Sequence, residues 1–404
     1  MSSKQVQDAY IVAATRTPIG RSGRGFFKNT RPDDLLIAAI LSAMKQVPTL
    51  DPAAIEDAII GCSFPEGEQG MNMARIAVAL CGFPKPIGGV TVNRFCASGI
   101  TAIQMAADRI RVGEADVMIA GGAESMSLVP MGGSKPSFNP RIFERDENIG
   151  IAYGMGLTAE KVAAQWKITR EQQDAFAYES HMRALKAQAA GEFADEMTPI
   201  DVIERFPDLS DGGVGGEQST RTRTVSLDEG PRKDTSLEGL AKLRAVFAAK
   251  GSVTAGNSSQ TSDGAGALIL ASEKAIKQYD LKPLARFVSF ASRGVPPEIM
   301  GIGPIEAIPA ALRYAGLKID DIGWIELNEA FAAQSLAVIN TVGLDQSKVN
   351  PMGGAIALGH PLGATGAIRS ATVIHALHRH NLKYGMVTMC VGTGQGAAGI
   401  FERV

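Results

Sequence analysis

The stretch Val92-Asn93-Arg94-Phe95-Cys96-Ala97-Ser98-Gly99 joins a strand-like run at residues 91–93 to a helical stretch at residues 100–112. An apolar run at residues 117–120 follows and stops at Gly121-Gly122. We interpret this unit as a strand, a turn that contains Cys96, a helix and a second strand. The alternation predicts an α/β protein, with Cys96 directly before a helix.

A second unit of similar order occurs late in the chain. Val349-Asn350 leads through a glycine-rich turn to His360, then to a helical stretch at about residues 365–378 and to a strand at residues 385–389 that ends at Cys390. Both units begin with Val-Asn and hold a reactive side chain just before a helix. This single pair of units indicates an internal duplication.

The composition excludes several classes of protein. The chain has 404 residues and a net charge of -2, which is long enough for two or more cores and shows no basic excess for nucleic acid. No segment reaches the roughly 20 apolar residues that cross a bilayer. Neither a presequence at the start nor a peroxisomal tripeptide at the end is evident. We therefore expect a cytoplasmic enzyme without a membrane span.

Metal and disulfide chemistry are not expected. The cysteines lie far apart and lack metal-ligand spacing, which predicts free thiols at Cys62, Cys81, Cys96 and Cys390. We interpret the first two as packing residues. His375, His378 and His380 form an H-x-x-H-x-H pattern at a predicted helix end, where solvated cations are favoured. His181, on a helical stretch at residues 158–190, belongs to no motif.

Cys96 and His360 are the first two candidates for catalysis. The unpaired N–H groups at a helix start favour a thiolate at Cys96, although a buried structural cysteine is the alternative. His360 lies within a run of glycines from Gly353 to Gly363. Its imidazole could serve as a base for Cys96, and a core histidine is the alternative.

Cys390 and Asn328 are the other two candidates. Cys390 is predicted at the carboxyl end of a strand, where open α/β sheets place ligands. The G-x-G-x-x-G spacing after it is not a dinucleotide site, since the sequence printed ends at Val404, before the required helix. Asn328 follows a strand at residues 325–327. It could cap the next helix or point its amide into a site, and capping is favoured from this stretch alone.

Together, residues 93–99, 328–331, 353–363 and 390–399 resemble, in order, the four signature segments of the thiolase family. The resemblance covers nearly the whole chain. It implies duplicated βαβαβαββ halves that form a five-layered α-β-α-β-α core with an inserted loop domain. We expect the N-terminal half at residues 1–124 and 250–272, the inserted domain at 125–249 and the C-terminal half at 273–404.

The resemblance also implies a mechanism. Cys96 is acylated, His360 accepts its proton, and Cys390 protonates the enolate of acetyl-CoA and later deprotonates CoA. One oxyanion hole is formed by His360 with a water held by Asn328, and the other by the backbone N–H groups of Cys96 and Gly392. Coenzyme A is a co-substrate, no cofactor is bound permanently, and the CoA site includes Arg232, Ser259 and Met155.

One position departs from part of the family. Gly154 precedes Met155, whereas short-chain acetoacetyl-CoA thiolases resemble one another in a histidine there. The smaller residue favours a degradative 3-ketoacyl-CoA thiolase of fatty-acid β-oxidation over the alternative, a biosynthetic acetoacetyl-CoA thiolase. Two rivals are a ketoacyl synthase, which typically uses two histidines, and a non-catalytic acyl-CoA or lipid-binding protein.

The resemblance further implies an oligomer. Family members form homodimers or homotetramers, and the strand at residues 91–93 is the expected dimer region. A partner enzyme of β-oxidation is compatible with this assignment. The acyl chain length, the physiological direction and the choice between dimer and tetramer are not determined by one sequence.

Overall fold

The core is one mixed ten-stranded sheet in a computed structural model that describes residues 6–210, 216 and 218–404. Its order is β10-β11-β12-β9-β1-β8-β5-β3-β4, and β2 pairs with β8. The strands are β1 (Tyr10–Arg16), β2 (Gly20–Arg21), β3 (Asp57–Gly61), β4 (Val90–Val92), β5 (Val117–Ser125), β8 (Ser262–Ala271), β9 (Ala285–Gly294), β10 (Ile322–Leu327), β11 (Tyr384–Val391) and β12 (Gln395–Arg403). Only Tyr10 and Ile11 of β1 pair with β9, so the sheet falls into two parts.

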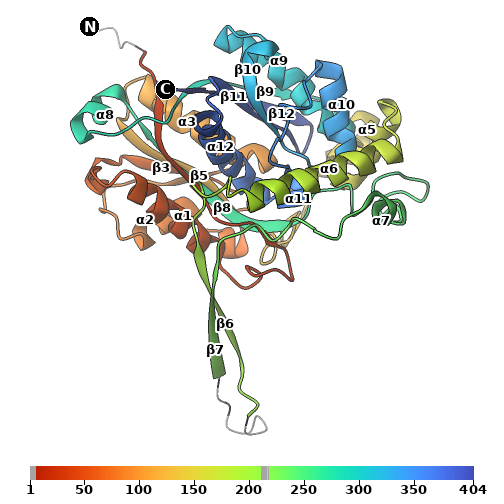
Figure 1. Ribbon diagram of the computed structural model, residues 1–404, viewed down its shortest axis with the longest axis horizontal. Coiled ribbons are helices and arrows are strands. Elements are labelled where there is room, and N and C mark those ends of the chain that lie inside the picture. The colour runs from red at the N-terminus through yellow and green to blue at the C-terminus, as the bar shows by residue number, and fades with distance from the viewer. Residues whose placement is uncertain (1–5, 211–215, 217) are drawn as a thin grey trace.

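Helices cover both outer faces and separate the two parts of the sheet (Figure 1). The central layer contains α3 (Ser98–Arg111) and α12 (Leu362–Arg379), each of which contacts strands of both parts. One outer face is covered by α1 (Pro32–Gln46), α2 (Met73–Leu80) and α8 (Glu273–Tyr279), and the other by α9 (Gly303–Ala315) and α10 (Ala332–Val342). The expected α-β-α-β-α layering is confirmed.

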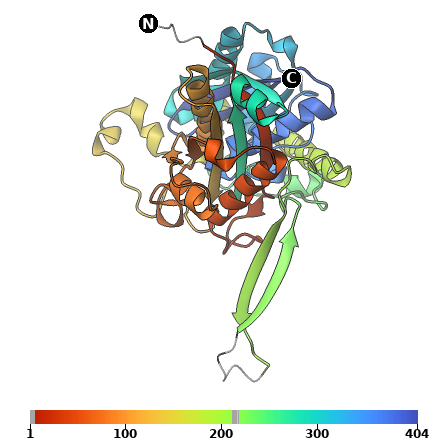
Figure 2. The same cartoon turned by 90° about the vertical axis from the view of Figure 1, so that its left-hand side faces the viewer.

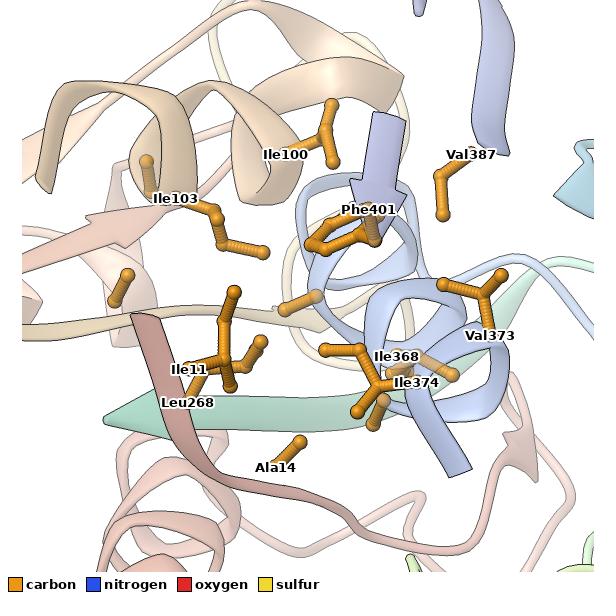
Figure 3. Packing of buried hydrophobic residues seen from close by; sticks show 14 of the residues in the cluster. Ile11, Ala14, Ile100, Ile103, Leu268, Ile368, Val373, Ile374, Val387 and Phe401 are labelled. Atoms are coloured by element: carbon orange, nitrogen blue, oxygen red, sulfur yellow. The ribbon is translucent and has the colours of Figure 1, made fainter. Parts of the chain in front are cut away.

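The central layer is packed almost entirely with apolar side chains. Figure 3 shows Ile100 and Ile103 of α3 facing the sheet and α12 across one cluster. Other members are Ile11, Leu268, Ile368, Ile374, Val387 and Phe401. Burying each such side chain contributes about 1.5–3 kcal/mol. The two helices that follow Cys96 and His360 are therefore both held in one apolar cluster.

The two central helices touch backbone to backbone at glycines. A Cβ atom added to Gly99 of α3 would lie 2.6 Å from the backbone N of Ala367. One added to Gly366 of α12 would collide with the backbone N of Ile100. Glycine is therefore required at both positions for this close approach.

The segment between β5 and β8 holds several helices and a separate hairpin. Its elements are α4 (Asp146–Ile149), α5 (Met155–Gln165), α6 (Arg170–Ala189), β6 (Ile200–Pro207), β7 (Gln218–Val225) and α7 (Leu237–Ala241). Strands β6 and β7 form a two-stranded ribbon that projects away from the body of the molecule (Figures 1 and 2). The helical stretch expected at residues 158–190 is present as two helices, because Thr169 and Gln172 form a capping box that begins α6 as a new helix.

Two further expectations concern the whole chain. Among the described residues, no helix combines the length and apolar character needed to cross a membrane. The division at residues 124, 249 and 272 stays a prediction, as does the internal duplication.

Candidate active site

Cys96 lies in a tight turn that its neighbours hold in place. The turn is a 3-10 segment, Phe95–Ala97, that leads directly into α3, as predicted. Asn93 Oδ1 accepts a hydrogen bond from the Phe95 N–H at 2.7 Å, and the Ser98 hydroxyl donates to the Phe95 carbonyl oxygen at 2.7 Å. Phe95 adopts a left-handed φ of 43°. The turn buries the Cys96 side chain, which is 7% exposed.

His360 is held by two hydrogen bonds that define its protonation. It follows α11 (Ala355–Leu358) and lies just before α12. The Thr365 hydroxyl donates to the Pro361 carbonyl oxygen at 2.9 Å, so its oxygen accepts from Nδ1 of His360 at 2.6 Å. Nδ1 therefore carries the proton. Nε2 is left as an acceptor, 3.2 Å from Nδ2 of Asn328.

Asn328 is a buried site residue and not a helix cap. Helix α10 begins at Ala332 with Phe331 as its N-cap, so the favoured capping interpretation is wrong. The Asn328 N–H donates to the carbonyl oxygen of Thr388 in β11 at 2.9 Å. Its Oδ1 is buried without a hydrogen-bond partner among the described residues. The backbone of Asn328 is therefore held by β11 while its side-chain amide faces His360. This is the alternative to capping, in which the amide points into a site.

Cys390 and Gly392 complete the group from the end of β11. Cys390 is fully buried, and burial raises the pKa of its thiol. Cys96 lies near enough for a thiolate there to raise this pKa further. The backbone N–H groups of Gly392 and Cys96 lower the pKa of the Cys96 thiol, which places both near its sulfur. Residues after Gly394 form strand β12, so the exclusion of a dinucleotide site agrees with the structure.

Burial makes the resting site electrically neutral. It raises the pKa of the Cys96 thiol to about 12, outweighing the two backbone N–H groups that lower it. The backbone N–H groups favour the thiolate, as expected, but the effect of burial on the Cys96 pKa is larger. Burial, and then the charge of Arg369, lower the pKa of His360 to about 3. A neutral thiol thus accompanies a neutral imidazole that can accept its proton.

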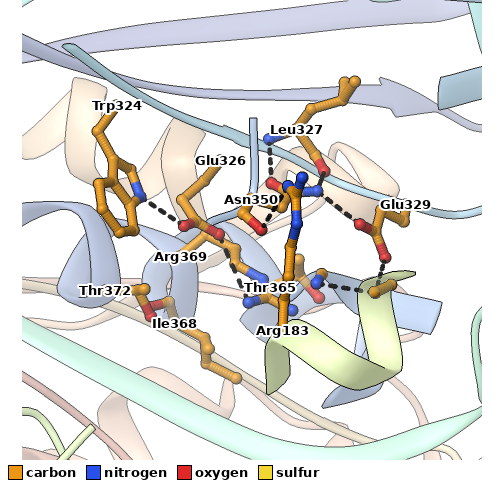
Figure 4. A network of polar contacts seen from close by, with 12 residues as sticks. Arg183, Trp324, Glu326, Leu327, Glu329, Asn350, Thr365, Ile368, Arg369 and Thr372 are labelled. Atoms are coloured by element: carbon orange, nitrogen blue, oxygen red, sulfur yellow. Dashed lines mark hydrogen bonds and ion pairs between the residues drawn. The ribbon is translucent and has the colours of Figure 1, made fainter. Parts of the chain in front are cut away.

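A buried polar network connects the segment after Asn328 to the segments around it (Figure 4). No sequence motif predicted this network. The Glu329 carboxylate accepts from the Ser180 hydroxyl at 2.7 Å, from Nδ2 of Asn350 at 2.8 Å and from the backbone N–H of Ile356 at 3.2 Å. It thereby ties α6 to the segment that ends at His360. The one sequence feature that could have indicated this network is the carboxylate residue Glu329, directly after Asn328.

An ion pair lies next to this carboxylate. Glu326 lies 3.5 Å from Arg369 and accepts a hydrogen bond from the Trp324 indole N–H at 2.7 Å. Burial raises the pKa of Glu326 to about 7, against the opposing effect of Arg369. Arg369 is therefore a buried cation close to His360, and it disfavours the protonated imidazole.

The residues expected at the CoA site fall in two places. Met155, the first residue of α5, packs against the cluster that contains Cys390 and Phe331. The Ser259 N–H donates to the carbonyl oxygen of Ala330 at 2.9 Å. The structure therefore brings Met155 and Ser259 to the segment that carries Asn328.

Arg232 lies on a neighbouring loop. Its side chain is exposed, and its backbone N–H donates to Nδ1 of His181 at 3.2 Å. Burial and the charges of Arg232 and Arg21 lower the pKa of His181 to about 4. No role for His181 was predicted, but its neutral imidazole holds the Arg232 loop in place through this hydrogen bond.

The sequence predicts free thiols at the cysteines and solvated side chains at His375, His378 and His380. All four cysteines are free. Within the described ranges, no group of His, Cys, Asp or Glu is arranged to hold a metal ion. His375 is not simply solvated, because its Nε2 lies 2.8 Å from the carbonyl oxygen of Ala14.

Known proteins give the same classification as this geometry. Residues 9–274 match the family profile described as "Thiolase, N-terminal domain", and residues 281–403 match "Thiolase, C-terminal domain". The chain belongs to the thiolase family, and it is an acyltransferase.

Individual thiolases are similar to this chain over nearly its whole length. The 3-ketoacyl-CoA thiolase of Bacillus subtilis (strain 168) is 47% identical over 397 residues, covering 98% of this chain and 100% of that protein. The acetyl-CoA acetyltransferase of Bacillus anthracis has a TM-score of 0.88 at 38% identity, with 100% of both chains covered. Human mitochondrial 3-ketoacyl-CoA thiolase in complex with CoA has a TM-score of 0.87 at 38% identity, again with 100% of both chains covered.

Proposed function

We propose that this protein is a 3-ketoacyl-CoA thiolase that cleaves its substrate with CoA into acetyl-CoA and a shortened acyl-CoA. The observation that carries the proposal is a set of buried reactive side chains on adjoining segments. Asn328, which contacts His360, is bonded through its backbone N–H to β11 at Thr388, two residues before Cys390. Cys96 and Cys390 interact electrostatically, and His360 contacts Asn328. This set supplies a nucleophile, a base and a second acid–base group, which thiolytic cleavage requires.

The reaction begins at Cys96. Nε2 of His360 accepts the thiol proton while sulfur attacks the 3-keto carbon. The bond between C2 and C3 then breaks, and the electron pair leaves as the enolate of acetyl-CoA, which takes a proton from Cys390. In the second half, the Cys390 thiolate removes the proton of CoA. The CoA sulfur displaces Cys96 from the acyl group, and His360 returns the proton to Cys96.

Two groups of donors stabilise the negative oxygens that form. The backbone N–H groups of Cys96 and Gly392 serve one oxygen, which agrees with their position near the Cys96 sulfur. Protonated His360, with a water held by Asn328, serves the other. Losing one such donor costs about 2.7–4 kcal/mol of barrier. Because these donors are buried and fixed before substrate arrives, little reorganisation is needed.

The substrate class is the less constrained part of the proposal. Gly154 is exposed at the N-cap of α5, and a Cβ atom added there would meet no atom within 4 Å. This open space next to Met155 supports a broad or longer-chain substrate of fatty-acid β-oxidation. The names of the relatives support it as well, since the more similar one is called a 3-ketoacyl-CoA thiolase. A short-chain acetoacetyl-CoA thiolase is the second candidate, supported by the acetyl-CoA acetyltransferase of similar fold.

We also propose that the protein works as a homodimer or homotetramer that pairs through β4. Strand β4 lies at one end of the ten-stranded sheet, and Val90 is 39% exposed. An unpaired edge can extend a sheet into a second copy. Strand β4 leads directly to the Cys96 turn. Pairing of β4 with a second copy of the chain would therefore hold this turn in place. Light scattering of a Val90→Lys variant tests this, and an unchanged mass would argue against the edge.

The central experiment is turnover of a series of 3-ketoacyl-CoA esters with CoA, compared between the wild type and Cys96→Ala. We expect loss of the keto-thioester absorbance with the wild type alone and an acyl group on Cys96 by mass spectrometry. The preferred chain length decides between the two candidate functions. Binding of acyl-CoA without cleavage would refute the enzyme and support the lipid-binding rival.

A further inference from the structure

Two arginines that the mechanism does not use lie beside Arg232. Strand β2 ends at Arg21, and the next residue, Ser22, donates its N–H to the carbonyl oxygen of Thr261 at 2.9 Å. Thr261 in turn forms a β-bridge with His360. On its other side, Nη2 of Arg21 donates to the carbonyl oxygen of Gly230 at 3.2 Å. Arg21 therefore lies between the segment after Ser259 and the segment before Arg232.

The loop geometry keeps this arrangement close to the glycine-rich segment before His360. A Cβ atom added to Gly230 would collide with the carbonyl oxygen of Ala357. A Cβ atom added to Gly25 would collide with Glu229 Oε2 and the backbone of Arg21. The positions of Arg21 and Arg24 are thus set by backbone packing and not by flexible side chains.

Positive charge here exceeds the negative charge available to pair with it. Arg232 and Arg24, together with burial, lower the pKa of Arg21, and Glu229 and Asp234 only partly offset them. Glu229 Oε2 is occupied by the backbone N–H groups of Arg21 at 2.9 Å and of Phe26 at 3.3 Å.

Neither guanidinium of this pair is satisfied by a carboxylate. Within the part of the chain that the structure describes, Nε of Arg21 is buried without a hydrogen-bond partner, and the exposed Arg24 side chain makes no ion pair. The positive charges of Arg21 and Arg24 are therefore not neutralised by a carboxylate of the described residues, which leaves them available to an anion.

We propose that Arg21 and Arg24, together with Arg232, bind the phosphate groups of the CoA substrate. The inference rests on the proposed function and extends its substrate site. Guanidinium groups are suited to this task because their N–H donors match two phosphate oxygens at once. Three arginines on two linked loops would hold the nucleotide end of CoA while the thiol end reaches Cys96.

Binding of three probes separates the phosphate contacts from all other contacts. Calorimetry measures the Kd of CoA, dephospho-CoA and pantetheine for the wild type, Arg21→Gln and Arg24→Gln. We expect each substitution to raise the Kd of CoA about tenfold, the usual value for losing one charged hydrogen bond. The Kd of pantetheine stays unchanged because it has no phosphate. If dephospho-CoA is weakened as much as CoA, the contact is with the diphosphate; if it is not, the contact is with the 3′-phosphate.

A matched control removes a positive charge elsewhere. Arg313, exposed in the last turn of α9, serves as Arg313→Gln, which should leave every Kd unchanged. Thermal melting checks the fold of each variant. Arg24→Gln keeps the test valid if Arg21→Gln is unstable, since the exposed Arg24 side chain has no hydrogen bond or ion pair to another described residue.

The proposal is overturned if both variants bind CoA as the wild type does, if they weaken pantetheine equally, or if the wild type binds CoA no tighter than pantetheine. These measurements need no turnover. A protein that binds CoA through Arg21 but cleaves no 3-ketoacyl ester therefore keeps this subsite and loses the proposed reaction.

Discussion

Replacing Thr365 by valine tests whether His360 acts as the base in one fixed tautomer. Valine has the same shape but no hydroxyl, so Nδ1 of His360 loses its acceptor at 2.6 Å. A buried N–H left unpaired costs about 1–3 kcal/mol. The histidine can then move its proton to Nε2, where it would face the Asn328 amide and could no longer accept the Cys96 proton. If the whole cost appears in the barrier, kcat falls about 5- to 150-fold.

The KM should change little, because Thr365 contacts His360 and Pro361 and is itself buried. Thiolysis of a 3-ketoacyl-CoA ester gives kcat and KM. The rate at which iodoacetamide modifies Cys96, located by peptide mapping, reports proton acceptance without substrate and should fall as well. Thr365→Ser keeps the hydroxyl and should recover most of both rates. If folded Thr365→Val retains kcat within about twofold of the wild type, the tautomer argument is refuted.

Three further predictions follow from the site. Cys390→Ala should still permit acylation of Cys96, seen by mass spectrometry, while turnover falls about 10²–10⁴-fold; normal turnover would remove Cys390 from the mechanism. Gly154→His should lower kcat/KM for long acyl chains relative to acetoacetyl-CoA by about tenfold, since it fills open space, and an unchanged ratio would show that the acyl chain does not pass there. Burial and the nearby arginines lower the pKa of His181 to about 4, from the ordinary histidine value of 6.5. Between pH 6.5 and pH 4, His181 is protonated in the unfolded chain but neutral in the native state. The free energy of unfolding therefore decreases as the pH drops from 6.5 towards 4. Urea unfolding should show His181→Asn losing about 1–2 kcal/mol less than the wild type between pH 7 and pH 5, and equal losses would contradict the shift.

Local sequence patterns predicted the parts of the site that depend on local structure. Cys96 before α3 and Cys390 at the end of β11 follow from strand and helix periodicity. The break between α5 and α6 was also readable, since Thr169 and Gln172 have the spacing of a capping box.

The remaining features of the site depend on contacts between residues that are far apart in the sequence. Asn328 has the sequence context of a cap, but the burial of Glu329 against α6 and Asn350 delays the helix until Ala332. The high pKa of Cys96 depends on how deeply the fold buries it, which no local motif encodes. The pairing of Thr365 with His360 and of Arg21 with the Gly230 segment likewise joins residues whose relation only the folded chain reveals.

The contact of Gly99 with Gly366 has a consequence for how this enzyme can diverge. Each glycine lies within the first two turns of the helix that follows a reactive residue, and each presses on main-chain atoms of the other helix. The relative position of the two reactive segments therefore depends on a contact between main-chain atoms of α3 and α12, in which the side chains of neighbouring core residues take no part. Mutations that enlarge or reshape the acyl pocket can accumulate around this contact while the reacting groups keep their separation.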